Sequence, residues 1–586
     1  MIFGERRCCI FVVMLKYGVS VLICSLVFGT AAAQWRFEGD STPRWEQVIA
    51  RYAEFDRTRA GAELIEIGKD DDGSPIHLFV LSDGSSFSPD SIRAAGKNIL
   101  WITNGIHPGE PDGIDASLLL AQALLDSDQL MGLLTNTAVC IVPVYNVSGA
   151  KQRSSTSRAN QNGPAEYGFR GNARNLDLNR DFIKADSRNT RTLIAALTAW
   201  DPDVYFETHV SNGADHQYVM ELLTTHHDKL DPALRGFMEE RLVPRQYDWM
   251  RQRGLLMCPY FETLHHVPEE GLTGFVDGPR YSTGYNALRQ RIGILSETHM
   301  LKPYADRVNA TLQLMLGTLA CMNEHPQELK KARTEARSNA MNVTLHATNW
   351  SIDTSRVEAL DWKGYATEQV QSEVTGLPRL RYDRNKPTVV KVPWMNSAGY
   401  GYQVQRPAAY LIPAAWKELI DRLRLDAVPM EVLTQERTGR VEVQRILDHA
   451  DARSPFEGHY LHSKITTASE WETWVMQPGD VLVPMGHATD ALVMEILEPR
   501  CADSFFAWGF FDSILQQKEW FSDYVFEDIA ADLLEKDPAL KATFGAERAN
   551  DPAFAKDAWA QLYFIYRHSP YFEPGFRRYP VLRVMD

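Results

Sequence analysis

Residues 98–113 read NILWITNGIHPGEPDG and decide the fold of the surrounding chain. The first six of these residues, NILWIT, form an apolar run that predicts a buried strand. Asp112 then begins a stretch with helical periodicity that continues to Leu125. His107 and Glu110 lie between strand and helix, so this order places both side chains at the carboxyl end of a sheet strand. Open α/β sheets build their sites at that edge.

The chain on either side of this stretch alternates short apolar runs with helical patterns. A hairpin is predicted over 64–82 and a helix over 45–55. Further buried strands are predicted at 138–144, 203–208 and 293–296. This alternation predicts the α/β class, with a mixed, mostly parallel central sheet flanked by helices.

The sequence divides into regions of different character. The α/β region is expected to span residues 34–325, and the charged residues 326–344 predict a linker or a closing helix. Residues 345–586 predict a C-terminal α+β region, β-rich over 345–500 and helical over 501–586. No motif in that region indicates its role.

The N-terminus predicts a signal peptide over residues 1–33. Basic residues flank an apolar run at 17–30, and an alanine triplet that ends at Ala33 forms the cleavage site. Met14 is an alternative start, and a retained membrane anchor is the alternative reading of the segment. We therefore expect an exported protein, periplasmic or secreted, with no membrane association after cleavage.

The composition is that of a folded protein, with 44 % hydrophobic and 23 % charged residues. The formal net charge is −15 and no basic block is present, which argues against a nucleic-acid partner. Removal of the signal peptide leaves four cysteines whose pairing the sequence leaves open. They are Cys140, Cys258, Cys321 and Cys501.

A His followed three residues later by a Glu occurs three times, so the spacing alone proves nothing. Only His107 and Glu110 follow a predicted buried strand; the other pairs lie in polar stretches and are expected on the surface. Those pairs are His266/Glu269 and His325/Glu328. Imidazole and carboxylate are zinc ligands, and a catalytic zinc uses three protein ligands. His209 follows the predicted strand 203–208 and is the candidate third ligand.

Glu297 directly follows the last buried strand. A carboxylate there is costly unless it is paired or functional, which makes it a candidate general base. Asn179 and Arg180 lie in a polar stretch, and Arg beside Asn offers donors matched to a carboxylate.

The ordered set His107-Pro108-Gly109-Glu110, Asn179-Arg180, His209 and Glu297 resembles the carboxypeptidase A-type zinc carboxypeptidases. The resemblance covers roughly residues 40–320. It implies one Zn²⁺ per chain, held by His107, Glu110 and His209. It implies that Glu297 is the general base, that Asn179 and Arg180 bind the substrate's terminal carboxylate, and that Asp177 orients the first zinc histidine.

The same resemblance implies an arginine that polarises the scissile carbonyl and a mobile tyrosine. The local sequence favours Arg158 for the arginine; the other candidates are Arg153, Arg170 and Arg174. Tyr281 is the expected tyrosine, although Phe275 stands nearer the usual spacing and Tyr285 is also available.

The implied activity is hydrolysis of the C-terminal peptide bond of a peptide. One alternative is a zinc-dependent deacylase or amidase that acts on acyl-amino acids or cell-wall peptides with the same scaffold. A second is a non-catalytic binding protein. The sequence contains neither HExxH nor GxSxG, which argues against two other hydrolase classes.

Overall fold

The computed structural model describes residues 36–84 and 87–585, and the predicted signal peptide lies outside the described residues. An eight-stranded sheet of order β1-β2-β4-β3-β5-β10-β6-β7 forms the centre of the first region. Its strands are β1 (Ala62–Lys69), β2 (Pro75–Leu81), β3 (Asn98–Thr103), β4 (Thr137–Val142), β5 (Val204–Ser211), β6 (Met220–Thr224), β7 (Met257–Pro259) and β10 (Ile292–His299). The pairs β3–β4, β3–β5, β5–β10 and β6–β7 are parallel, and the other three pairs are antiparallel. The predicted mixed, mostly parallel sheet is confirmed.

Helices cover both faces of this sheet because its inner strands are apolar on both sides. In β3, Leu100 and Ile102 pack into one core while Ile99 and Trp101 pack into the other. The first core includes α2 (Trp45–Thr58), α4 (Asp112–Asp126), α8 (Pro232–Phe237), α9 (Val243–Gln252) and α11 (Tyr304–Glu324). The second includes α3 (Pro89–Ala94), α7 (Arg188–Trp200) and α10 (Ser282–Leu288). Two short helices, α5 (Asp128–Met131) and α6 (Val147–Lys151), complete this region.

Two strands run further than their sequences predict. β5 continues to Ser211 and β10 to His299, so His209 and Glu297 lie inside strands rather than after them. The two residues are register partners in neighbouring parallel strands. Their polar side chains interrupt the apolar pattern that sequence periodicity detects, although His209 is buried and Glu297 is partly buried.

The C-terminal region is built on a second sheet of six strands, in the order β16-β19-β15-β20-β17-β18. Its strands are β15 (Ala409–Ile412), β16 (Glu431–Val432), β17 (Arg437–Asp451), β18 (His462–Met476), β19 (Val481–Pro484) and β20 (Leu582–Val584). Helices α13 (Lys417–Leu425) and α14 (Asp490–Leu497) pack beside it. A smaller sheet pairs β11 (Leu345–Ile352) with β14 (Ala398–Gln405).

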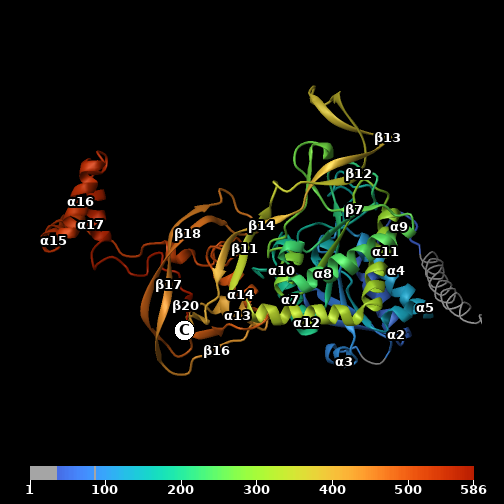
Figure 1. The fold of residues 1–586 in the computed structure, drawn as a ribbon, viewed down its shortest axis with the longest axis horizontal. Helices are drawn as coiled ribbons and strands as arrows, with labels where there is room; N and C mark the ends of the chain where they lie inside the picture. Colours follow the sequence, from blue (N-terminus) through green and yellow to red (C-terminus); the bar gives the residue numbers. More distant parts are fainter. Residues whose placement is uncertain (1–35, 85–86, 586) are drawn as a thin grey trace, which may run out of the picture.

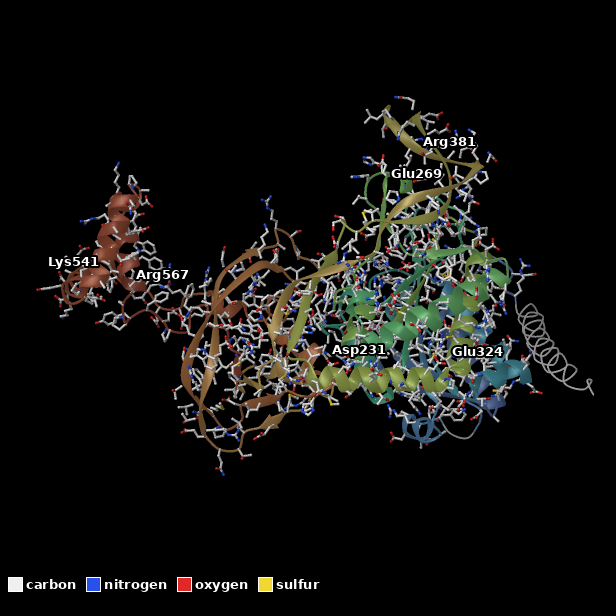
Figure 2. The ribbon with its side chains drawn as sticks, viewed as in Figure 1. Asp231, Glu269, Glu324, Arg381, Lys541 and Arg567 are labelled. Atoms are coloured by element: carbon white, nitrogen blue, oxygen red, sulfur yellow. The ribbon has the colours of Figure 1, made fainter. Side chains whose placement is uncertain are left out.

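Three further helices form a separate unit that projects from the six-stranded sheet on extended segments (Figure 1). They are α15 (Asp523–Lys536), α16 (Pro538–Asn550) and α17 (Ala558–Arg567). Their apolar side chains form their own core, and Figure 2 labels Lys541 and Arg567 on this unit. β20 then returns the chain to the sheet.

The two regions share structure across the expected boundary at residue 345. The helix α12 (Pro326–Asn342) occupies the charged stretch and packs against α8. Beyond it, the long hairpin of β12 (Glu358–Gln371) and β13 (Pro378–Met395) rises from the body, with Arg381 on it (Figure 2). β13 pairs with β9 (Leu272–Thr273), which pairs with β8 (Glu262–Thr263). The second core also joins Phe182 of the first region with Trp508 of the C-terminal region. The division into domains therefore stays a prediction.

The four cysteines of the described residues are buried and free. In the part of the chain that the structure describes, no helix combines the length and the apolar character needed to cross a membrane.

Candidate active site

The carboxyl ends of β3, β5 and β10 bring the predicted ligands and base to one cavity. His107 and Glu110 lie in the turn between β3 and α4, His209 lies in β5 and Glu297 in β10. All four side chains line a cavity of about 540 Å³. The edge of the sheet that the sequence indicated is therefore hollowed where these residues meet.

His107, Glu110 and His209 present three donor atoms to a common point. His209 Nδ1 lies 3.1 Å from Glu110 Oε2, and His107 Nδ1 lies 3.5 Å from the same oxygen. Donors about 2.0–2.2 Å from one tetrahedral zinc are themselves a little over 3 Å apart. His107 Nδ1 is buried and has no hydrogen-bond partner among the described residues. The donor set and its spacing fit zinc.

Each histidine is held from behind by a carboxylate. Asp177 Oδ1 lies 2.8 Å from His107 Nε2, and Glu207 Oε2 lies 3.0 Å from His209 Nε2. A proton on Nε2 satisfies each carboxylate and leaves Nδ1 free to bind a metal, the usual arrangement around metal-ligating histidines. The chain itself thus orients both imidazoles so that each can bind a metal through Nδ1.

Glu110 is charged in this setting. Burial opposes its ionisation, but the Arg158 guanidinium and His107 hold the pKa of Glu110 well below its usual value. Arg158 Nη1 donates to Glu110 Oε1 at 2.6 Å, which leaves Oε2 directed at the two histidines. An anionic carboxylate is the form that binds a cation.

Glu297 is the partly buried carboxylate beside this triad. It is the register partner of His209 on one side and of Glu221, in antiparallel β6, on the other. Burial raises the pKa of Glu297 to about 8; His209 opposes this rise, and the charges of Glu110 and Glu221 add to it. A carboxyl group at this position can carry a proton near neutral pH.

The residues predicted to bind the substrate, Asn179, Arg180 and Tyr281, lie together in the cavity wall. All three line the cavity, and the Arg180 guanidinium lies 4.5 Å from the centre of the Tyr281 ring. Asn179 lies in a short 3₁₀ turn, and its Oδ1 accepts a hydrogen bond from Ser282 N at 3.1 Å. Arg180 therefore offers a positive charge at the cavity wall.

Two of the four candidate arginines reach the cavity. Arg158 and Arg170 both line it, and Arg170 also pairs with Asp177. Arg153 donates instead to Thr42 O, and Arg174 to Asp186 O. Neither Arg153 nor Arg174 is among the residues that line the cavity.

The aromatic candidates also differ in whether they reach the cavity. Tyr281 and Phe275 line the cavity with their rings 5.1 Å apart. Tyr285 is buried and donates to Asp426, so it faces away from the metal ligands. Tyr260 also lines the cavity, although the sequence did not single it out.

The sequence analysis missed Glu207. Its spacing offered a signal, because a residue two positions before a ligand in a strand projects on the same face as that ligand. Glu207 also accepts hydrogen bonds from Tyr205 OH and Ser282 Oγ, so it joins β5 to the segment that carries Tyr281. The surface positions predicted for His266 and His325 agree with their partly or fully exposed environments.

Comparison with known proteins gives a consistent result. A family profile described as "Zinc carboxypeptidase" matches residues 55–234, which include the three metal-donor residues but end before Glu297. "Carboxypeptidase 2" of Trichophyton rubrum is 22 % identical over 461 residues, 74 % of this chain and 77 % of that protein. "Probable carboxypeptidase 2" of Trichophyton verrucosum is 24 % identical over 443 residues, 72 % of this chain and 78 % of that protein.

Solved structures with similar folds include a metallo-carboxypeptidase from Pseudomonas aeruginosa in complex with (2-guanidinoethylmercapto)succinic acid. It is 19 % identical, with a TM-score of 0.35, and the match covers 49 % of this chain and 70 % of that one. Carboxypeptidase A from Helicoverpa armigera is 14 % identical, with a TM-score of 0.36, over 54 % of this chain and 81 % of that one. The family profile over residues 55–234 and the curated relatives show that this chain is similar to zinc carboxypeptidases, and they support a metallocarboxypeptidase hydrolase.

Proposed function

We propose that this protein is an exported, zinc-dependent exopeptidase that hydrolyses the C-terminal peptide bond of peptides. One observation carries the proposal: a triad of metal-donor residues, the carboxyl group of Glu297 and a positively charged wall share one cavity. Hydrolysis at a chain terminus needs all three, because water must be activated, a proton must be moved and the terminal carboxylate must be recognised.

The substrate is oriented by Asn179 and Arg180. Arg180 forms an ion pair with the terminal carboxylate, and Asn179 donates from its amide group. This pairing selects a free carboxyl end and sets the distance from that end to the metal ligands. Tyr281, stacked on Arg180, limits the orientations of the guanidinium.

Glu297 moves the proton. His107, Glu110 and His209 would hold the zinc ion, which when bound would supply a Lewis acid for the scissile carbonyl and for water. Glu297 accepts a proton from the attacking water as the new carbon–oxygen bond forms. It returns a proton to the departing amine when the carbon–nitrogen bond breaks. Arg158 or Arg170 stabilises the negative charge that develops on the carbonyl oxygen.

A substrate panel tests this proposal. Blocked dipeptides with a free carboxylate should be hydrolysed, their C-terminal amides should not, and a zinc chelator should abolish the activity. Preferential cleavage of acyl-amino acids or cell-wall peptides in the same panel would instead support a deacylase or amidase. Equal rates on free and amidated dipeptides would contradict the role of Asn179 and Arg180.

The proposal of export rests on the sequence of residues 1–33 alone. Cleavage after the alanine triplet gives a mature chain that begins at Gln34. N-terminal sequencing of the protein from its native cells tests this, and a retained residue 1 or 14 would contradict it.

A further inference from the structure

The C-terminal region contacts the segment that carries the carboxylate-binding residues. The loop between β17 and β18 contacts the segment 177–186 at its first and last residues. Glu457 Oε2 accepts a hydrogen bond from the backbone N–H of Asp177 at 2.7 Å, and His459 Nε2 lies 2.6 Å from Asp186 Oδ2. Asn179 and Arg180 lie between these two anchor points.

A second pair of contacts anchors the segment that carries Tyr281. Arg280 Nε donates to Asp503 Oδ1 at 2.7 Å, and the Arg280 guanidinium lies 4.8 Å from the centre of the Trp508 ring. Asp503 is 2 % exposed, so this ion pair is desolvated on the carboxylate side. Both segments that form the substrate side of the cavity are thus fixed by C-terminal residues.

These segments need outside support because their own backbone is irregular. Residues 171–186 contain turns and one 3₁₀ turn, with Asn175 at a φ of 60° and Ala185 at a φ of 48°. This left-handed region is unfavourable for non-glycine residues, which persist in it only where surrounding contacts hold them. Local backbone preferences therefore do not account for the shape of this segment.

The Asp186 carboxylate, at one of these anchor points, is paired with positively charged side chains. Asp186 contacts Lys184 at 3.0 Å and Arg422 at 3.2 Å in addition to His459. Burial opposes its ionisation, but the hydrogen bond with His459 and the charge of Lys184 hold the pKa of Asp186 well below its usual value. This carboxylate joins a residue of the first region to two of the C-terminal region.

We propose that the C-terminal region is the positioning scaffold of the carboxylate-binding clamp, with Glu457 as its main positioning residue. Among the residues that the structure describes, none beyond Met300 lines the cavity, so the region acts through the clamp rather than on the substrate. Glu457 fixes Asp177, which lies three residues before Arg180 and also orients the zinc ligand His107. This inference rests on the proposed function, because it assigns the clamp to a terminal carboxylate.

The test compares Glu457→Ala with Glu457→Gln in the full-length protein. Loss of the anchor should raise the KM for free-carboxylate dipeptides about three- to tenfold, the effect of one hydrogen bond, with kcat nearly unchanged. Glutamine retains an oxygen acceptor for Asp177 N–H, so Glu457→Gln should stay within about twofold of wild type. An unchanged KM in Glu457→Ala would overturn the proposal.

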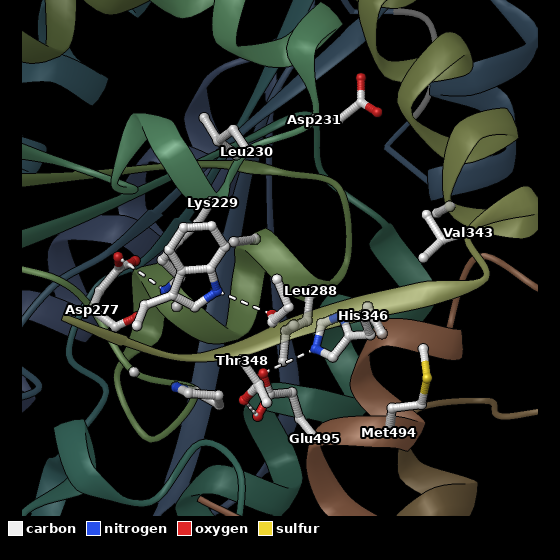
Figure 3. A pocket seen from close by; sticks show the side chains of 18 of the residues that line it. Lys229, Leu230, Asp231, Asp277, Leu288, Val343, His346, Thr348, Met494 and Glu495 are labelled. Carbon is white, nitrogen blue, oxygen red and sulfur yellow. Dashed lines mark hydrogen bonds and ion pairs between the residues drawn. The ribbon is translucent and has the colours of Figure 1, made fainter. Parts of the chain in front are cut away.

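Glu495→Ala is the matched control. Glu495 Oε1 pairs with His346 Nε2 at 3.0 Å within the C-terminal region, beside a cavity that borders the first region (Figure 3). Its loss should lower thermal stability without changing KM. If Glu495→Ala raised KM as much as Glu457→Ala, the effect would be general destabilisation and the proposal would fail.

Two further measurements separate this inference from the function itself. In a double-mutant cycle, Glu457→Ala should add little to the KM effect of Arg180→Ala, because both act on one clamp; additive effects would overturn the proposal.

Hydrogen exchange of residues 177–186 requires no substrate. Faster exchange in Glu457→Ala than in Glu495→Ala supports the anchor even if the dipeptides prove to be poor substrates, and equal exchange contradicts it. Absence of hydrolysis by wild type would contradict only the proposed function.

Discussion

Two buried His–Glu–His clusters lie at neighbouring positions of the central sheet. The first contains His107, Glu110 and His209, and the second contains His216, Glu221 and His299. Each cluster holds its three donor atoms within 4.8 Å of one another, and all six residues are buried. The two clusters are connected through the sheet, since Glu297 is the register partner of both His209 and Glu221.

Their surroundings differ. Each histidine of the first cluster is backed by a carboxylate, and the cluster opens into the cavity. In the second cluster the ring of His216 packs against Trp362 and Phe261, and none of the three residues lines that cavity. Its carboxylate is already used, because Glu221 Oε1 contacts His216 Nε2 at 2.9 Å and accepts from Ser211 Oγ at 2.7 Å.

Cations also lie near the second cluster. Lys302 donates to the carbonyl oxygen of His216, and both Lys302 and Arg384 pair with Asp215. Further positive charge is unfavourable beside them. Donor types and burial are thus common to both clusters, and backing carboxylates and an open side distinguish the first cluster, which we propose as the catalytic metal site.

The largest expected effect is loss of the metal. His107→Ala should remove zinc and all hydrolysis, whereas His299→Ala should keep one zinc per chain. Metal analysis of the purified proteins measures this directly. Two metal ions in wild type, one of them lost in His299→Ala, would erase the distinction between the clusters.

Removal of the base comes next. Glu297→Gln should lower kcat by at least about 10³-fold and keep zinc, because it removes proton transfer but no ligand. Its neighbour in β6 provides the control: Glu221→Gln should leave kcat within about tenfold of wild type. Full activity of Glu297→Gln in steady-state assays would refute the assignment of the base.

The backing carboxylates give a smaller effect. Asp177→Asn should weaken zinc binding about 10- to 100-fold, the usual cost of losing such a partner. Ser211→Ala, which removes a donor to Glu221 in the second cluster, should leave zinc affinity unchanged. Competition with a chromophoric chelator measures both affinities, and equal values for the two variants would contradict the prediction.

The smallest effect concerns stability. Burial, together with His216 and Lys302, lowers the pKa of His299 to about 2; Arg384 adds to this effect, and Glu221 and Asp215 are the nearby acids. Because the unfolded chain binds a proton on this imidazole near its usual pKa of about 6.5 and the folded chain does not, stability is lost as pH falls below that value. Between pH 7 and pH 5, the free energy of unfolding should therefore fall by about 1–2 kcal/mol less in His299→Gln than in wild type. Urea unfolding at the two pH values measures this, and parallel losses would contradict it.

The sequence predicted the central sheet and all three residues of the first cluster because each element carries its own local signal. His107 and Glu110 follow one apolar run, and His209 follows another. The strand ends were predicted too early because His209 and Glu297 interrupt the apolar pattern, and their pairing depends on partners across the sheet.

Other features had no local signal. Glu457 meets Asp177 across 280 positions of sequence, and nothing in either segment predicts the other. The same holds for the shared core that joins Phe182 to Trp508. Contacts of this kind depend on how sheets and helices that are far apart in the sequence pack together. Neither periodicity nor residue spacing predicts such packing.

The order of strands in the six-stranded sheet has a consequence for biosynthesis. β20 lies between β15 and β17, and it is the element that joins the two halves of this sheet. A ribosome has already made the zinc ligands, the clamp and the three-helix unit before residues 582–584 emerge. The sheet that carries the β17–β18 loop therefore closes only afterwards. Until then, the β17–β18 loop that contacts residues 177–186 extends from two strands that have not yet been joined to the rest of their sheet.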